Sequence, residues 1–336
     1  MIRHKYVPSP KEKFIYLIDI VGTCNLRCPS CPVGNYTKDE YVDSGRSRGM
    51  MSVEKFDQIL HKIEGEKVAE EVIIGLYNWG EPTLHPDLPA FIKKVKEYGF
   101  TCNVSSNFNL VDLDIGAIVR SAPDFFRISV SGYRQEVYQQ THTKGNIYMV
   151  LSNLHRLRYF MDRLKKEFEV EVYFHLYRHN LDDVVQMKKV ADDLNFAFEM
   201  DMAYFMGLGK ILKYLDGGAL NEKDAQVNEL MILSHEERTE LAWQHKDDDC
   251  HARSHLTTIN WDGSVALCCA TYEASDTIAN DFNQFSHDEL QEMKYSHATC
   301  EKCTEKAQHV VAAQEPKHKL AEIGNQRIKE LMNQTD

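Results

Sequence analysis

Three cysteines on one short loop, Cys24, Cys28 and Cys31, constrain this chain more than any other feature. Their spacing is Cys-x3-Cys-x2-Cys, and they follow an apolar run, Phe14–Ile20, that reads as a buried strand. Three thiolates can hold three irons of a cubic [4Fe–4S] cluster, whose usual ligation is four cysteines. The fourth iron then keeps an open coordination position, as the metal in a catalytic site does. The loop therefore predicts chemistry at a metal.

Two other uses of these cysteines are a structural zinc loop and a disulfide. Zinc needs a fourth ligand, and no close Cys or His follows within the loop. The first residues, Met1–Tyr6, lack the apolar core of an export signal, so we expect a cytoplasmic protein with reduced thiols.

Size and charge limit the partners of the chain. Its 336 residues are enough for one large domain and a smaller one. The net charge of −12 works against binding to a nucleic-acid backbone. No run of about 18 apolar residues spans a membrane. We therefore expect a small-molecule or peptide substrate, no nucleic acid and no membrane.

Residues 1–205 alternate strand-like and helix-like segments, which predicts an α/β fold with parallel strands and right-handed crossovers. The expected strands are Phe14–Ile20, Glu71–Leu76, Phe100–Ser105, Phe125–Val130, Val170–Leu176 and Phe196–Met202. The expected helices are Val53–Ile63 with Ser52 as N-cap, Pro89–Tyr98, Met149–Phe168 and Leu181–Leu194. Six such units are too few for a complete eight-unit barrel.

The cysteine loop resembles the signature of radical S-adenosylmethionine (SAM) enzymes. In that family SAM chelates the open iron, and its reductive cleavage gives a 5′-deoxyadenosyl radical that abstracts hydrogen from substrate. The resemblance implies a partial (β/α)6 TIM-type barrel over residues 1–205, with the active residues at the carboxyl ends of its strands. It also implies a flavodoxin- or ferredoxin-type reductant. One residue departs from the family: Ser30 stands before the last cysteine, where an aromatic residue is frequent.

The segment Asn78–Pro82 resembles the family's Gly-Gly-Glu-Pro motif, with Trp79 in place of the first glycine. The resemblance implies that Gly80 and Glu81 bind the amino group of SAM. A carboxylate beside an ammonium is a favourable charge pair. Without the cysteine loop upstream, Gly-Glu-Pro would read as an ordinary turn.

Polar residues after the next strands resemble the family's ribose-binding positions. They are Ser106 and Asn107, and also Ser129, whose neighbour Ser131 replaces an acid common in relatives. Alternatively, these polar residues only solvate strand ends or cap helices. His142, Lys144 and Arg178 are further candidates to bind the SAM carboxylate or the substrate. Each could equally be a charge on the protein surface. Aromatic or imidazole side chains that would shape the pocket, or else fill the core, are Tyr16, Tyr77, His175, Tyr177 and Tyr204.

A second set of cysteines lies near the C-terminus: Cys250, Cys268, Cys269, Cys300 and Cys303. Trp261–Ser264 is a hairpin turn signal, and Cys300–Cys303 reads as a Cys-x2-Cys loop ahead of a helix. Two separated pairs can complete a zinc or cluster site.

This set resembles the SPASM and Twitch modules that follow radical SAM barrels. The resemblance implies an auxiliary [4Fe–4S] cluster held by Cys250, Cys268, Cys300 and Cys303. We therefore expect a helical linker over 206–249, a small β-hairpin-plus-helix module over 250–304, and a helical tail over 305–336 that is broken at Pro316.

Cys269 is left over, either as a structural residue or as the catalytic hydrogen-atom donor of an epimerase. The resemblance implies an oxidoreductase of the dehydrogenase type, which oxidises an alcohol of an amino sugar or cyclitol with the auxiliary cluster as electron acceptor. A radical SAM epimerase or peptide-modifying enzyme is the alternative. The alternative that is not an enzyme is a scaffold in which both cysteine sets bind zinc and no reaction is catalysed.

Overall fold

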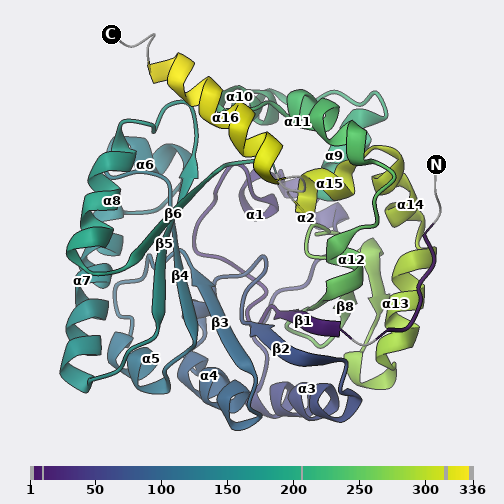
Figure 1. Cartoon of the computed structure of the whole chain (residues 1–336), viewed down its shortest axis with the longest axis horizontal. Helices are drawn as coiled ribbons and strands as arrows, with labels where there is room; N and C mark the ends of the chain where they lie inside the picture. Colours follow the sequence, from purple (N-terminus) through teal and green to yellow (C-terminus); the bar gives the residue numbers. More distant parts are fainter. Residues whose placement is uncertain (1–3, 10, 206, 314–316, 333–336) are drawn as a thin grey trace.

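A nine-stranded sheet organises the chain (Figure 1). The computed structural model describes residues 4–9, 11–205, 207–313 and 317–332. Strand order is β6-β5-β4-β3-β2-β1-β7-β8-β9. The six predicted strands are all present and pair in parallel. They are β1 (Lys11–Ile18), β2 (Ala69–Gly75), β3 (Thr101–Ser106), β4 (Phe125–Val130), β5 (Glu169–Leu176) and β6 (Ala197–Met202).

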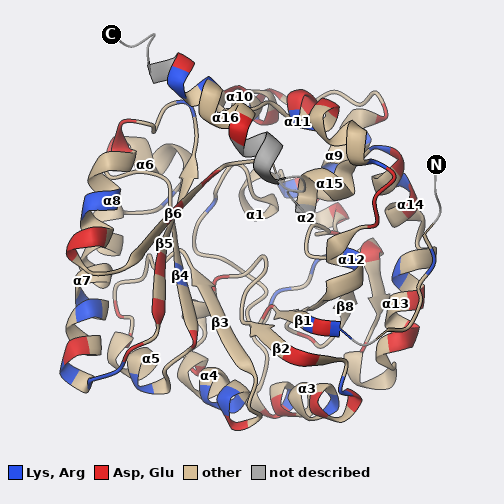
Figure 2. Cartoon of the chain, in the orientation of Figure 1, with Lys and Arg blue, Asp and Glu red and all other residues tan. Residues whose placement is uncertain are grey.

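Helices cover the outer face of these strands, as expected for a partial TIM-type barrel (Figure 1). They are α3 (Val53–Glu66), α4 (Leu88–Glu97), α5 (Ile115–Ser121), α6 (Gln135–Thr141), α7 (Ile147–Leu164) and α8 (Asp183–Asp193). The predicted N-cap is confirmed, because the side chain of Ser52 accepts the N–H of Lys55. Acidic and basic residues are spread over these outer helices (Figure 2). The α/β fold class is confirmed.

The two faces of a barrel strand carry different residues, as β4 shows. Phe126, Ile128 and Val130 are fully buried in the main core. Arg127 and Ser129 alternate with them and line an inner cavity. The sheet thus uses one apolar face for stability and leaves the other for polar side chains.

Near the C-terminus three short strands extend the same sheet: β7 (Leu256–Ile259), β8 (Val265–Ala266) and β9 (Thr277–Ala279). β7 pairs in parallel with β1, and Ile15 lies opposite Leu256. The predicted hairpin joins β7 to β8, which pair antiparallel. Gly263 has a φ of +91°, which glycine adopts without strain. The C-terminal strands therefore continue the barrel sheet at its β1 edge.

The remaining helices lie before, between and after these strands. Two short ones, α1 (Pro32–Asn35) and α2 (Lys38–Asp43), follow the cysteine loop. Between β6 and β7 lie α9 (Leu208–Leu215), α10 (Glu222–Leu230), α11 (His235–Ala242) and α12 (His251–His255). After β9 come α13 (His287–Ser296), α14 (Ala298–Glu305), α15 (Gln308–Ala313) and α16 (Lys317–Met332). Of the described helices, none has the length and apolar character to cross a membrane.

One prediction for this region is wrong. Cys300 and Cys303 lie inside α14 and not on a loop ahead of a helix. The side chain of His297 caps this helix by accepting the N–H of Thr299, so the helix already begins at Ala298. The predicted break at Pro316 falls outside the described residues.

Candidate active site and second cysteine site

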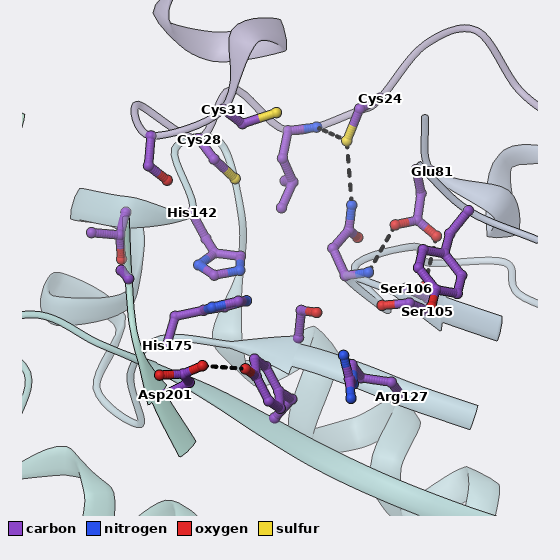
Figure 3. Close-up of a pocket in the computed structure, with 18 of the residues that line it drawn as sticks. Cys24, Cys28, Cys31, Glu81, Ser105, Ser106, Arg127, His142, His175 and Asp201 are labelled. Carbon is purple, nitrogen blue, oxygen red and sulfur yellow. Dashed lines mark hydrogen bonds between the residues drawn. The ribbon is translucent and has the colours of Figure 1, made fainter. Parts of the chain in front are cut away.

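A cavity of about 630 Å³ lies at the carboxyl ends of the barrel strands. The sequence-predicted residues that line it are Cys24, Cys28, Cys31, Gly80, Glu81, Ser106, Asn107 and Ser129. Figure 3 shows the three cysteines on one side of this cavity, Arg127 and Asp201 across from them, and His142 and His175 in between, with Glu81 and Ser106 along another side. The fold thus brings residues from seven segments of the chain into one space.

The cysteine loop is held by its own backbone and by neighbouring loops. The N–H of Cys31 donates to the carbonyl of Cys28 (3.1 Å), and the N–H of Arg27 donates to the carbonyl of Thr143 (3.0 Å). The Nη1 of Arg27 donates to the carbonyl of Cys24 (2.8 Å). All three thiols are free and partly exposed to the cavity. They are therefore arranged to bind a group inside it.

Glu81 is the most tightly held acid of the cavity. Its side chain is 3% exposed. Oε1 accepts from the N–H and hydroxyl of Thr83 (3.0 and 2.6 Å) and from the hydroxyl of Ser106 (2.6 Å), and Oε2 accepts the N–H of Asn107 (2.8 Å). Burial raises the pKa of Glu81, while the bonds from Ser106, Thr83 and Asn107 lower it. Because all four partners donate, the site is built for a carboxylate.

Gly80 lies so close to the first strand's loop that no side chain fits. A Cβ there would lie 1.6 Å from the carbonyl oxygen of Val21. The N–H of Gly80 donates to Asp19 Oδ1 (3.0 Å), and Arg46 Nη2 lies 2.9 Å from Asp19 Oδ2. This buried ion pair is a part of the site that local sequence patterns did not reveal, since its two residues lie on separate loops.

Trp79 connects the same loop to the C-terminal strands. Its backbone N–H donates to Asp19 (3.3 Å), and its indole N–H donates to the carbonyl of Thr271 (2.8 Å). The indole also packs edge-on against Tyr272, with ring centroids 5.8 Å apart. The residue that departs from the family motif is therefore a buried link between the two cysteine regions.

The opposite wall, on β4 to β6, contains charged residues that the sequence reading missed. Arg127 Nε lies 2.6 Å from Glu171 Oε1, and its guanidinium lies 4.3 Å from the ring centre of Tyr173. The hydroxyl of Tyr173 donates to Asp201 (3.2 Å), and Glu199 also lines the cavity. The available signal was a polar residue at every second position of strands otherwise read as apolar.

Two imidazoles lie between this wall and the cysteine loop (Figure 3). Burial lowers the pKa of His142 to about 3, with His175 contributing, and burial lowers the pKa of His175 to about 4. Their ring centroids are 6.4 Å apart, and His142 stacks on Tyr138. Both rings are therefore neutral near pH 7.

The structure separates the remaining candidates. Of the five pocket-shaping residues, Tyr77, His175, Tyr177 and Tyr204 line the cavity. Tyr16 instead is fully buried in the main core. Lys144 is exposed, and Arg178 donates to the carbonyl of Met231 (2.6 Å), so neither lines the cavity. The hydroxyls of Ser30 and Tyr177 form a hydrogen bond (3.0 Å) in which either can be the donor.

A second, smaller cavity contains the C-terminal cysteines. Its lining includes Cys250, Cys268, Cys269, Cys300 and Cys303, together with Arg253 and His309. Cys250 caps α12, and its Sγ accepts the N–H of Arg253 (3.4 Å). The Nδ1 of His309 is buried and has no hydrogen-bond partner within the described part of the chain. The fold thus brings the hairpin, α12 and α14 together around five thiols.

Cys269 lies between the two sites. It lines the smaller cavity. Burial raises the pKa of Tyr77 and of Tyr204, which line the larger cavity, and Cys269 adds to both shifts. The structure does not place Cys269 among the residues of the larger cavity.

The donor chemistry of both sites fits iron–sulfur clusters. Three thiols line the larger cavity and five line the smaller one, and these eight include the seven predicted ligands. Thiolates are the usual ligands of such clusters. Among the described residues, no three His, Cys, Asp or Glu side chains are close enough to hold one metal ion. The ligands of a cubane lie farther apart, because each thiolate binds a different iron.

Comparison with known proteins identifies the family. Over 99 residues the chain is 33% identical to the tungsten-containing aldehyde ferredoxin oxidoreductase cofactor-modifying protein of Pyrococcus furiosus, and the match covers 30% of this chain and 25% of that protein. It is 21% identical over 182 residues to the Fe-coproporphyrin III synthase of Methanosarcina barkeri, covering 52% and 40%. The chain thus spans less than half of either curated relative.

Solved structures show the same fold. SuiB of Streptococcus suis bound to S-adenosylmethionine has a TM-score of 0.54 at 12% identity, over 86% of this chain and 67% of that one. The protein anSMEcpe with bound AdoMet has a TM-score of 0.51 at 16% identity, over 86% and 82%. Residues 18–187 match the family described as the Radical SAM superfamily. The chain belongs to the radical SAM superfamily, whose members use SAM and a [4Fe–4S] cluster.

Proposed function

We propose that this chain oxidises a small, polar, positively charged substrate, such as the alcohol of an amino sugar or aminocyclitol. In this proposal Cys24, Cys28 and Cys31 hold the [4Fe–4S] cluster, and Cys250, Cys268, Cys300 and Cys303 hold an auxiliary one. When bound, the first cluster and SAM supply hydrogen-atom abstraction, and the auxiliary cluster supplies a one-electron acceptor. The observation that carries the proposal is the convergence of three free thiols and the fixed Glu81 carboxylate on one cavity.

Glu81 would bind the SAM ammonium, because its four donors hold it as an oriented carboxylate. The hydroxyl of Ser106 donates to Glu81. The side-chain amide of Asn107 donates to Asn25 Oδ1 (2.9 Å) and to Cys24 Sγ (3.5 Å). Both therefore position the cofactor ligands, and Ser129 on β4 is the better candidate for the ribose.

The wall on β4 to β6 would bind the substrate. Arg127 is paired with Glu171, so Glu199 and Asp201 give this wall a negative charge. An ammonium group on the substrate would complement it. Hydroxyls would find acceptors and donors on Tyr173 and the carboxylates.

The neutral imidazole of His175 would accept the proton that an alcohol loses on oxidation. A carbinol that has lost a hydrogen atom becomes a ketone by losing one more electron and one proton. His175, on β5, lines the cavity on the substrate wall. Burial lowers its pKa to about 4, so the ring is unprotonated near neutral pH but is a weak base, and it would pass the proton on and not keep it. The fold thus offers a proton acceptor beside the proposed substrate position.

A labelled-substrate experiment tests this function. Amino sugars and aminocyclitols deuterated at each carbinol carbon are incubated with the reconstituted protein, SAM and dithionite. We expect deuterium in 5′-deoxyadenosine from one position of one substrate, together with a ketone product. Deuterium transfer from a peptide, and from no alcohol in the panel, would contradict the proposal.

Peptide modification or epimerisation is the second candidate. SuiB has also been crystallised with its precursor peptide SuiA, and that structure shares the fold of this chain (TM-score 0.55, 13% identity). An epimerase needs a hydrogen-atom donor, and Cys269 lies near two tyrosines of the cavity. Cys269→Ala distinguishes the two: oxidation should continue in this variant, whereas epimerisation should stop.

A further inference from the structure

A lysine is buried beside the C-terminal cysteines. Lys294, on α13, is 1% exposed, although lysine is almost never fully buried unless paired. Its Nζ donates to the carbonyl of Leu256 (2.6 Å) and to the hydroxyl of Thr257 (3.0 Å). With the amide of Gln291 oriented to satisfy its neighbours, the Gln291 oxygen lies 3.3 Å from Nζ. These three partners are neutral.

Cysteine thiols, which become negative as thiolates, are the main titratable groups that act on this lysine. Burial lowers the pKa of Lys294 to about 8, and Cys268, Cys300, Cys250 and Cys269 act in the opposite direction. The helix α13 packs against α12, which Cys250 caps, and against α14, which carries Cys300 and Cys303. Among the described residues no carboxylate forms an ion pair with Lys294. A buried ammonium in this position lacks a counter-charge unless the thiols or their ligand supply it.

We propose that Lys294 is the counter-charge of the second site and makes an auxiliary cluster held there a better electron acceptor. This inference rests on the proposed function, because it requires a cluster at Cys250, Cys268, Cys300 and Cys303.

The physical reason is the change in charge on reduction. A thiolate-ligated cluster is an anion, and one added electron makes it more negative while no atom is transferred. In a low-dielectric interior the fixed ammonium attracts the reduced form more strongly than the oxidised form. Net charge around a cluster is one of the factors that set its reduction potential. Lys294 would therefore raise the potential, so that an electron from the substrate radical passes to this site.

Arg253 does not replace Lys294 in this role. Its Nη2 is paired with Asp249, and its guanidinium stacks 3.8 Å from the ring centre of Tyr295. Arg253 also acts on Cys250, Cys300 and Cys303, but it shares its charge with the carboxylate of Asp249. Lys294 is the neighbouring cation whose described partners are all uncharged apart from the thiols.

The test is a redox titration followed by EPR. It uses the full chain with Cys24, Cys28 and Cys31 replaced by Ala, so that the signal comes from the second site alone. Lys294→Met and Lys294→Gln remove the charge, and Lys294→Arg keeps it. Lys302→Met is the matched control: Lys302 lies between Cys300 and Cys303 in α14, but its side chain is 44% exposed and paired with Asp216.

We expect a more negative midpoint potential in both neutral Lys294 variants, at unchanged iron content. Lys294→Arg and Lys302→Met should stay near the parent value, because the first keeps the charge and solvent screens the second. A parent-like potential in the neutral variants, or an equal shift in Lys302→Met, would overturn the inference alone. A parent protein that binds no iron through these four cysteines would overturn the proposed function as well.

Discussion

Replacing Glu81 by Gln tests the proposed SAM contact most sharply. The carboxylate accepts four hydrogen bonds, from the N–H and hydroxyl of Thr83, the hydroxyl of Ser106 and the N–H of Asn107. In either amide orientation the Gln NH2 group faces one of the two backbone N–H groups, so a buried donor loses its acceptor. Such a loss costs about 1–3 kcal/mol of unfolding free energy.

SAM affinity should fall for a separate reason. A hydrogen bond to a charged group contributes about 1.5–3 kcal/mol, and each 1.4 kcal/mol is about a tenfold change in Kd. We therefore expect Glu81→Gln to raise the Kd for SAM about 10- to 100-fold, measured by anaerobic calorimetric titration of the cluster-loaded protein.

The matched control is Thr83→Val, which removes one hydroxyl from Glu81 but keeps the carboxylate and the backbone N–H. It should lower stability by about 1 kcal/mol in denaturant unfolding and change the Kd less than threefold or so. The reasoning is refuted if Glu81→Gln binds SAM as tightly as the parent, or if Thr83→Val weakens binding equally.

Three further changes test other parts of the site. Gly80→Ala places a Cβ against the carbonyl of Val21, so the loop must shift and we expect lost SAM binding and about 1–3 kcal/mol lower stability, measured by titration and denaturant unfolding. The pKa of His142 is lowered to about 3 in the folded protein, below its unfolded value near 6.5. Its contribution to stability is therefore complete above about pH 6.5 and falls as pH drops toward 3; melting curves of cluster-free protein should show a weaker acid dependence in His142→Gln. Trp79→Phe removes the N–H bond to the carbonyl of Thr271 and part of the packing against Tyr272, and should cost about 1 kcal/mol or more in denaturant unfolding; unchanged stability would contradict the role of Trp79 as a buried link.

The cofactor-binding half of the site could be predicted because its residues are local. Cys24, Cys28 and Cys31 share one loop, and Gly80 and Glu81 follow directly on the next strand. Parallel strands place their carboxyl ends at one edge, so adjacent motifs had to meet. In the structure these five residues line one cavity.

The other half depends on contacts between distant segments. The Asp19–Arg46 ion pair joins two loops, and β7 pairs with β1 although the two strands are far apart in sequence. No local periodicity reports such pairings. Arg127 and Asp201 were missed because apolar residues dominate their strands and the polar positions point inward.

The helix at Cys300–Cys303 was read as a loop because metal-binding Cys-x2-Cys pairs commonly lie on turns. The capping side chain of His297 decides otherwise, and it lies three residues before Cys300. Because His is not one of the usual N-cap residues, the start of this helix could not be predicted from the sequence.

The central claim is that two cysteine sets of this chain each hold a cluster. Iron and acid-labile sulfide are measured in anaerobically reconstituted parent protein, in a variant with Cys24, Cys28 and Cys31 replaced by Ala, and in one with Cys250, Cys268, Cys300 and Cys303 replaced. The account predicts about eight irons per chain in the parent and about four in each variant. Stoichiometric zinc without sulfide in the parent, or an unchanged iron content after replacing either set, would contradict it.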